Sequence, residues 1–182
     1  MKTNSNELLH QLGLITQSNM TAAKAFLDLG EAQLNYKGSP NSWSILECME
    51  HLNRYSAYYL PEIERHLDTS SMPPQHEFKS GFMGNYLVNM VIPKTDVKKM
   101  KTFSSMDPSG SYLSRDVISA FLASQDKLLE LINRSRSANI NKAGIAVTFT
   151  RLIKLKTGDA LRFMAYHNQR HILQAQRVKS YE

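Results

Sequence analysis

Residues 43–55, WSILECMEHLNRY, contain the clearest helix start in the chain. Ser44 and Glu47 have the Ser-x-x-Glu spacing of a capping box, in which each side chain accepts a hydrogen bond from the backbone N–H of the other residue. Trp43 and Cys48 stand on either side of this pair, at the positions of a hydrophobic staple. The stretch therefore predicts a helix whose start, near Ser44, fixes the direction of the side chains that follow.

An apolar stripe continues along this helix. Its members recur at helical spacing and are Ile45, Met49, Leu52, Ser56, Tyr59 and Ile63. Pro61 interrupts the pattern. Because proline has no backbone N–H and its ring clashes with the preceding turn, we expect Pro61 to kink the helix or to end it early.

Three further segments show helical periodicity. The first covers roughly residues 5–29, with Gly30 as its stop; the next begins near Ser111 and fades after Ile132; the last runs from about 157 to 178. A β-prone stretch, IAVTFT, precedes the last segment.

Residues 68–110 separate the second predicted helix from the third. They mix Pro, Gly and Ser with one short apolar piece, so we expect a long crossover or lid with a turn or two of helix. Four amphipathic helices with this connection predict an all-α fold, a four-helix bundle with a long crossover between helices 2 and 3.

Length and composition favour a single globular domain, residues 1–182. The 42% of hydrophobic and 21% of charged residues are ordinary for a soluble protein, and one cysteine, Cys48, excludes an internal disulfide framework. The first residues do not resemble a signal peptide, and no apolar run approaches the length of a membrane span. We therefore expect a cytoplasmic protein with no membrane partner.

The net charge of +6 raises the question of a nucleic-acid partner. The basic residues occur in PKTDVKKMK, in TRLIKLK and as scattered singles, without a run interleaved by aromatic residues. We expect a solvated basic surface and regard nucleic-acid binding as the less favoured alternative. Lys98, Lys99 and Lys101 are the residues whose neutralisation would test it.

Two histidines of the last predicted helix, His167 and His171, are four residues apart. They lie one turn apart on the same side of a helix, close enough for both rings to bind one metal ion. They also fall within the apolar face, where a polar ring must be hydrogen-bonded, ligated or exposed through a cleft. His51 lies at the border of the apolar stripe on the second helix.

These three histidines are candidates for one metal site. Neutral imidazoles suit zinc, nickel, copper or iron, and three protein ligands plus water is the pattern of an open, catalytic site. Spacing alone leaves the alternative of core or surface histidines that only satisfy one another. The remaining histidines show no comparable arrangement and are predicted to be surface residues: His10, His66 and His76.

The motifs resemble those of the DinB-like superfamily of metal-binding four-helix proteins, which includes the YfiT-type predicted metal-dependent hydrolases. Its pattern is a Trp-Ser, a Glu and a His-Leu on the second helix, and His-x-x-Arg-His-x-x-Gln on the last. The matching residues are Trp43, Ser44, Glu47, His51 and Leu52, followed by His167, Arg170, His171 and Gln174. The resemblance extends over nearly the whole chain.

This resemblance implies a divalent metal ion, nickel or zinc, held by His51, His167 and His171. The superfamily includes predicted hydrolases and enzymes that use low-molecular-weight thiols, such as S-transferases. We therefore expect a metal-dependent hydrolase or small-thiol transferase acting on a small molecule. The alternative is a non-catalytic metal- or ligand-binding stress-response module, and a homodimer is one assembly to test.

Neighbouring residues have alternative roles. Glu47 is either a base or only the helix cap, and Cys48 is a fourth ligand, a nucleophile or, as we expect, a buried thiol. Arg170 either binds an anionic substrate or is solvated, and Gln174 orients water or a ligand ring. Two aromatic residues are expected to serve packing, Trp43 and Tyr55.

Overall fold

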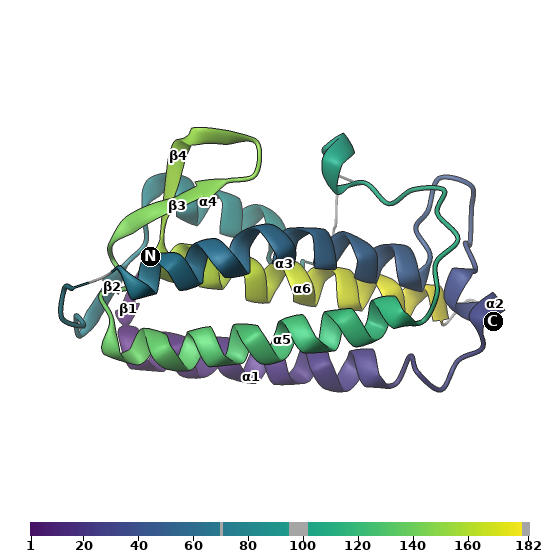
Figure 1. Ribbon diagram of the computed structural model, residues 1–182, viewed down its shortest axis with the longest axis horizontal. Coiled ribbons are helices and arrows are strands. Elements are labelled where there is room, and N and C mark those ends of the chain that lie inside the picture. The colour runs from purple at the N-terminus through teal and green to yellow at the C-terminus, as the bar shows by residue number, and fades with distance from the viewer. Residues whose placement is uncertain (70, 95–101, 180–182) are drawn as a thin grey trace.

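The computed structural model describes residues 1–69, 71–94 and 102–179. Four long helices form its body: α1 (Ser5–Lys24), α3 (Ile45–Asp68), α5 (Asp116–Arg134) and α6 (Thr157–Lys179). They lie side by side (Figure 1), with α3 packed against α5 and α6, and α1 packed against the same two helices. The all-α bundle is therefore confirmed. Lys98, Lys99 and Lys101 lie outside the described residues.

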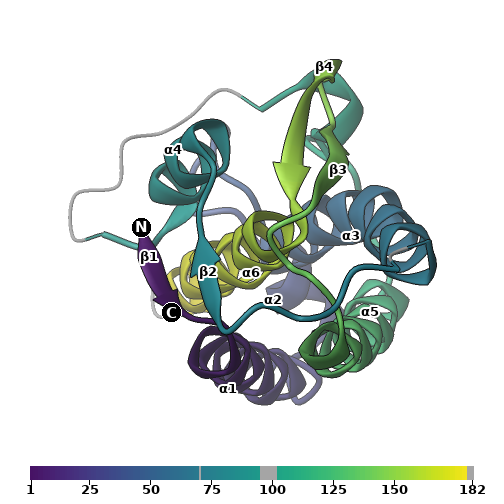
Figure 2. The same ribbon diagram turned by 90° about the vertical axis from the view of Figure 1, so that its left-hand side faces the viewer.

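The smaller elements lie around this bundle. The helical ones are α2 (Glu31–Asn35), α4 (Phe82–Val91) and two 3₁₀ turns, η1 (Ser104–Met106) and η2 (Ser135–Ser137). The strands are β1 (Lys2–Asn4) with β2 (Glu77–Lys79), and the hairpin of β3 (Ala143–Val147) with β4 (Thr150–Lys156); both pairs are antiparallel. In Figure 2 the hairpin and α4 lie on the side of α3 and α6 away from α1 and α5.

The crossover between α3 and α5 contains more regular structure than its composition predicts. The short apolar piece forms the ten-residue α4, which packs against α6. No helix of the described chain is long and apolar enough to cross a membrane.

Two predicted helix ends are wrong. α1 ends at Lys24 and not near residue 29, because the chain changes to bonds over three residues, from Phe26 N–H to the Ala23 carbonyl and from Leu27 N–H to the Lys24 carbonyl. Gly30, the predicted stop, is the N-cap of α2.

α5 begins at Asp116 and not near Ser111. The Asn35 amide accepts a hydrogen bond from the Leu113 N–H at 3.0 Å and donates one to the Leu113 carbonyl at 2.9 Å. Both backbone groups of Leu113 are therefore held by a side chain, which keeps this residue out of the helix.

Pro61 does not end α3 early, because the helix continues to Asp68. Leu60 and Ile63, on either side of the proline, are both buried. Burial of this apolar face offsets the loss of one backbone hydrogen bond.

His66 is not a surface residue. It is 5% exposed, its Nδ1 lies 3.1 Å from the hydroxyl of Thr157, and its ring covers Gly144 of β3 so closely that a Cβ there would lie 2.3 Å from Nε2. The hairpin packs on the last turn of α3, a tertiary contact that the helix pattern does not contain. His10 and His76 are exposed, as predicted.

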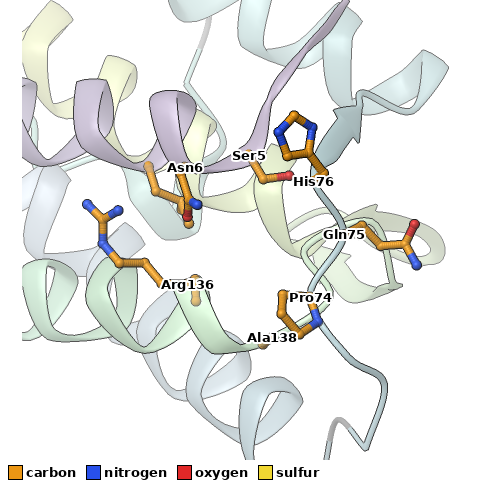
Figure 3. A pocket seen from close by; sticks show the side chains of 9 residues that line it. Ser5, Asn6, Pro74, Gln75, His76, Arg136 and Ala138 are labelled. Atoms are coloured by element: carbon orange, nitrogen blue, oxygen red, sulfur yellow. The ribbon is translucent and has the colours of Figure 1, made fainter.

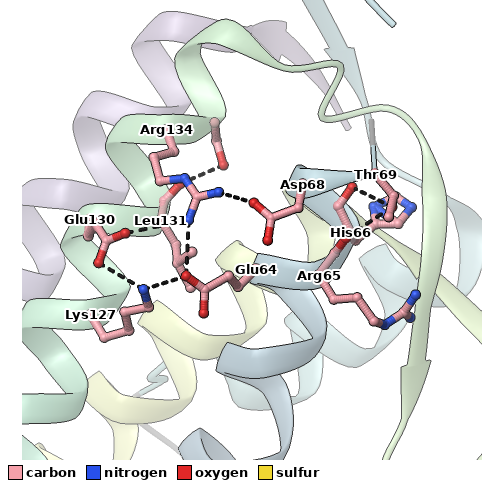
Figure 4. Close-up of polar contacts among 10 residues, drawn as sticks. Glu64, Arg65, His66, Asp68, Thr69, Lys127, Glu130, Leu131 and Arg134 are labelled. Atoms are coloured by element: carbon pink, nitrogen blue, oxygen red, sulfur yellow. Dashed lines mark hydrogen bonds and ion pairs between the residues drawn. The ribbon is translucent and has the colours of Figure 1, made fainter. Parts of the chain in front are cut away.

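Ion pairs join α3 to α5 (Figure 4). Lys127 Nζ lies 2.6 Å from the carboxylate of Glu64, and Arg134 lies 3.1 Å from the same carboxylate and also contacts Asp68. About a third or more of each of these side chains is exposed, so solvent screens the attraction and the pairs stabilise the fold only modestly.

Candidate metal centre

α3 and α6 bring three histidines together in the interior. His51 comes from α3, and His167 and His171 come from successive turns of α6. One ring nitrogen of each lies within 4.8 Å of the others, and the three residues are 2%, 4% and 9% exposed. The structure thus places all three predicted ligands in one buried cluster.

The cluster lies where two apolar clusters of the core meet. Along α3, the buried apolar residues up to Leu52 belong to one cluster and those from Tyr55 onward belong to the other. Along α6, the change from one cluster to the other falls between Ala165 and Ile172. The histidines of α6 fall inside the second interval, and the histidine of α3 lies beside the first. Polar rings at this boundary are surrounded by apolar atoms on both sides.

The capping box that starts α3 is confirmed. The Ser44 hydroxyl accepts from the Glu47 N–H at 3.1 Å, and the Glu47 carboxylate accepts from the Ser44 N–H at 2.9 Å. These bonds set the register of the helix from its first turn, and His51 therefore faces α6.

A backbone carbonyl fixes the protonation of His51. Its Nδ1 lies 2.7 Å from the carbonyl oxygen of Met106, the last residue of η1. Because a carbonyl only accepts, Nδ1 must carry the hydrogen, and the lone pair of the neutral ring is left on Nε2. That Nε2 lies 3.2 Å from Nε2 of His167.

A side chain fixes His171 in the same way. Its Nδ1 lies 3.0 Å from Oε1 of Gln174, one turn further along α6, so Nδ1 donates and Nε2 keeps its lone pair. A ligand histidine that donates its second N–H to an oxygen is the common arrangement in metal sites. Nδ1 of His167 is buried without a hydrogen-bond partner among the described residues.

Burial keeps the three rings neutral. It lowers the pKa of His51 to about 4, against the opposing effects of the Met106 carbonyl and the Asp107 charge. Burial also lowers the pKa of His167 and His171 well below the usual value, and the neighbouring histidines and Arg170 add to this effect. Neutral imidazole is the form that binds a metal.

The distance between one pair of the nitrogens fits a shared metal ion. Two nitrogens that each lie about 2.0–2.1 Å from a zinc ion in tetrahedral geometry are about 3.3 Å apart. The 3.2 Å between Nε2 of His51 and Nε2 of His167 agrees with that value. No Asp, Glu or Cys of the described chain joins the cluster.

The segment that carries Met106 is held to α3, and to Trp43 just before it, at several points. Trp43 Nε1 donates to the hydroxyl of Ser109 at 2.8 Å, and Arg54 donates to the carbonyl of Asp107 at 2.9 Å. Gly110, with φ of 83°, adopts the left-handed conformation that glycine accommodates readily, and its N–H donates to Glu47 at 2.7 Å. These bonds hold the Met106 carbonyl within hydrogen-bonding distance of Nδ1 of His51.

Glu47 and Cys48 are parts of the scaffold. The fully buried Glu47 carboxylate bonds Ser44 and Gly110 and pairs with Lys37 at 2.6 Å. Cys48 is fully buried, and burial together with the Glu47 charge raises the pKa of its thiol. The expectation of a buried thiol is confirmed.

Aromatic rings surround the histidines. The ring of Trp43 lies 4.7 Å from His51 and 5.6 Å from His171, and the ring of Tyr55 lies 4.5 Å from His167. Trp43 and Tyr55 therefore pack directly on the site. Phe163 stacks on His167 at 5.1 Å, a contact that the sequence analysis did not single out although Phe163 precedes His167 by one turn.

Arg170 lies at the rim. It is partly buried and donates to the carbonyl of Met90, near the end of α4, at 3.5 Å. Its charge contributes to the low pKa of His167 and His171.

The sequence did not predict the hydrogen bond between His51 and the Met106 carbonyl. A backbone acceptor in a long crossover leaves no signal in residue type.

A family model described as the DinB superfamily matches residues 14–175. The matched range contains all three histidines, Met106 and Gln174. Comparisons with curated proteins and with solved structures find no match.

Proposed function

This chain belongs to the DinB superfamily, and we propose that its three histidines bind a divalent zinc or nickel ion as the centre of an enzyme acting on a small molecule. The observation that carries the proposal is the hydrogen bonding of two rings. His51 and His171 each donate Nδ1–H to a fixed oxygen and leave Nε2 available toward the cluster.

A bound divalent ion would supply Lewis acidity, which lowers the pKa of a coordinated water or thiol and polarises a carbonyl oxygen. Zinc and nickel ions both bind imidazole nitrogen, so the three histidines suit either metal. With three protein ligands, an exogenous ligand has room to bind.

The chain's own residues would orient the site and exclude water. The Met106 carbonyl and the Gln174 amide hold two of the rings, while Trp43, Tyr55 and Phe163 cover the histidines with apolar surface. In such an environment, charges interact more strongly than in water.

Two reaction classes follow from this arrangement. One is hydrolysis of an ester or amide, and the other is transfer of a low-molecular-weight thiol to an electrophile. The charge of Arg170 beside the histidines of α6 favours an anionic substrate or thiol in either class. We expect a small-molecule partner and not a nucleic acid, and a cytoplasmic location, where small thiols are kept reduced.

Metal content of protein purified without chelator tests the site. The parent should contain about one zinc or nickel ion per chain, and His51→Ala and His171→Ala should contain little. His10→Ala is the matched control, because His10 is exposed on α1. Equal metal in all four proteins would contradict the assignment of the site.

Turnover then tests the reaction. The metal-loaded parent is assayed with a panel of esters and amides, and separately with small thiols and an electrophile. Activity that is lost in His51→Ala and kept in His10→Ala supports an enzyme and names its class. Metal binding without turnover on either panel would instead make the chain a metal-binding module.

A further inference from the structure

A layer of buried polar side chains crosses the middle of the bundle, and each of the four long helices contributes to it. None of its members is more than 3% exposed: they are Thr16 and Asn19 of α1, Ser56 of α3, Gln125 of α5 and Asn168 of α6. We call these five residues the polar layer. Buried polar groups in the middle of helices need an explanation, because apolar side chains are the usual occupants of the interior.

The polar layer separates the two apolar clusters of the core. On α1 it falls between Leu12, of one cluster, and Ala23, of the other, and the same change of cluster occurs across Gln125 on α5. On α6 the layer residue, Asn168, directly follows His167. The polar layer therefore lies at the level of the three-histidine cluster.

Polar side chains at the end of the bundle have a simpler explanation. Figure 3 shows Asn6, Gln75 and Arg136 around a cavity at the start of α1, and all three are exposed. Water reaches such groups, whereas the polar layer has no exposed member. Its polar groups depend on one another and on the backbone for hydrogen bonds.

Two hydrogen bonds of the polar layer hold α6. The Asn168 amide donates to the side-chain oxygen of Gln125 on α5 at 2.9 Å, and the Asn19 amide of α1 donates to the Ala165 backbone carbonyl at 3.2 Å. Ala165 lies two residues before His167, and Asn168 lies one residue after it. The two bonds therefore attach α6 to α5 and α1 beside the turn that carries the first of its ligand histidines.

The polar layer is not arranged for the greatest stability. Ser56 Oγ and Asn168 Oδ1 are buried without a hydrogen-bond partner among the described residues. A buried polar group without a partner destabilises a fold, whereas apolar groups of the same shape in place of both members of a polar pair are nearly neutral or stabilising. A hydrogen bond between two side chains, however, specifies one arrangement of their helices, and apolar packing is less specific.

We propose that Asn19, Gln125 and Asn168 are positioning residues, which fix the rotation of α6 about its axis so that its two histidines meet His51. The inference rests on the proposed metal binding. Side-chain tips lie about 5–6 Å from a helix axis, so a rotation of α6 by about 10° moves a ring nitrogen by about 1 Å. Because ligand distances in a metal site vary by only about 0.2 Å, a rotation of this size weakens coordination.

The double variant Gln125→Met/Asn168→Leu tests the proposal, since it removes both partners together and keeps side chains of similar size. We expect it to be at least as stable as the parent in urea unfolding with chelator present. Its dissociation constant for zinc, measured by competition with a chromophoric chelator, should rise about tenfold or more. The matched control, Asn133→Leu/Gln176→Met, makes the same changes at exposed positions of α5 and α6 and should bind zinc like the parent.

Asn19→Leu is a second variant that acts from a different helix. It removes the donor to the Ala165 carbonyl and should weaken zinc binding about two- to tenfold.

A zinc dissociation constant equal to the parent's in either variant would overturn the proposal. A double variant that fails to fold, or that loses stability together with affinity, would also overturn it, because a structural role alone explains that result. If the parent itself binds no zinc, the metal assignment fails and the positioning role with it, an outcome distinct from equal binding by parent and variants.

Discussion

Nε2 of His51 and Nε2 of His167 lie 3.2 Å apart, although 116 residues separate them in the chain. The contact joins α3 to α6 across the interior of the bundle. Two neutral rings at this distance share at most one hydrogen, whereas a metal ion would satisfy the lone pairs of both. The contact between these two nitrogens therefore bears on the stability of the fold, on the protonation of the two rings and on metal binding.

Gln174→Ala should weaken metal binding about 10- to 100-fold, because His171 loses the acceptor that orients its ring. Trp43 is the one tryptophan, and its ring lies close to two of the histidines, so its fluorescence during a zinc or nickel titration reports binding. Gln176→Ala, on the exposed side of the same helix, should leave the titration unchanged.

The metal-free protein should lose stability as the pH falls from about 6.5 toward 4. The folded His51 has a pKa near 4, against an ordinary value of 6.5, so the unfolded chain binds more protons in this window. Each such histidine changes the free energy of unfolding by up to about 1.4 kcal/mol per pH unit.

Urea unfolding with chelator present, repeated between pH 7.5 and 5, measures this slope. His51→Leu should flatten it, since one buried titrating group is removed. A slope that is the same in parent and variant would show that His51 does not titrate differently in the folded and unfolded states.

Glu47→Ala should destabilise the fold by about 3 kcal/mol. It leaves the Lys37 ammonium without its partner and frees the backbone N–H groups of Ser44 and Gly110. Glu50→Ala is the matched control. Glu50 pairs with Arg54 on the same helix but is partly exposed, so thermal or urea unfolding should show a loss below about 1 kcal/mol.

Gly110→Ala should cost about 1–2 kcal/mol, because an alanine with φ near 83° is strained even though no atom lies within 4 Å of the added Cβ. Gly38→Ala provides the comparison, since Gly38 has equally open space and no positive φ. Because neither site is crowded, a lower stability of Gly110→Ala in urea denaturation reports backbone strain; equal stabilities would argue against strain at residue 110.

The ligands and their helices could be predicted because their signals are local. Ser44 and Glu47 mark the start of α3 by spacing alone, and His167 and His171 fall on one side of a helix by periodicity. The resemblance of both motifs to the DinB-like pattern then predicted that these two helices, which are distant in the sequence, share one site.

What could not be predicted depends on tertiary contacts. The start of α5 is displaced by the amide of Asn35, and His66 is buried by a hairpin that packs on it from another part of the chain. Continuation of α3 through Pro61 likewise depends on what its buried face packs against. Each of these contacts joins residues too far apart in the sequence for a local hydrophobic or capping pattern to include both.

The hydrogen bond from His51 ends on a main-chain oxygen, so the side chain at position 106 is not what holds the ring. Sequence drift at Met106 can therefore be tolerated as long as the backbone keeps its path. Selection would act on the residues that determine this path, such as the left-handed Gly110 and the carboxylate of Glu47 that holds it. Comparison of related chains should find constancy there and variation at 106.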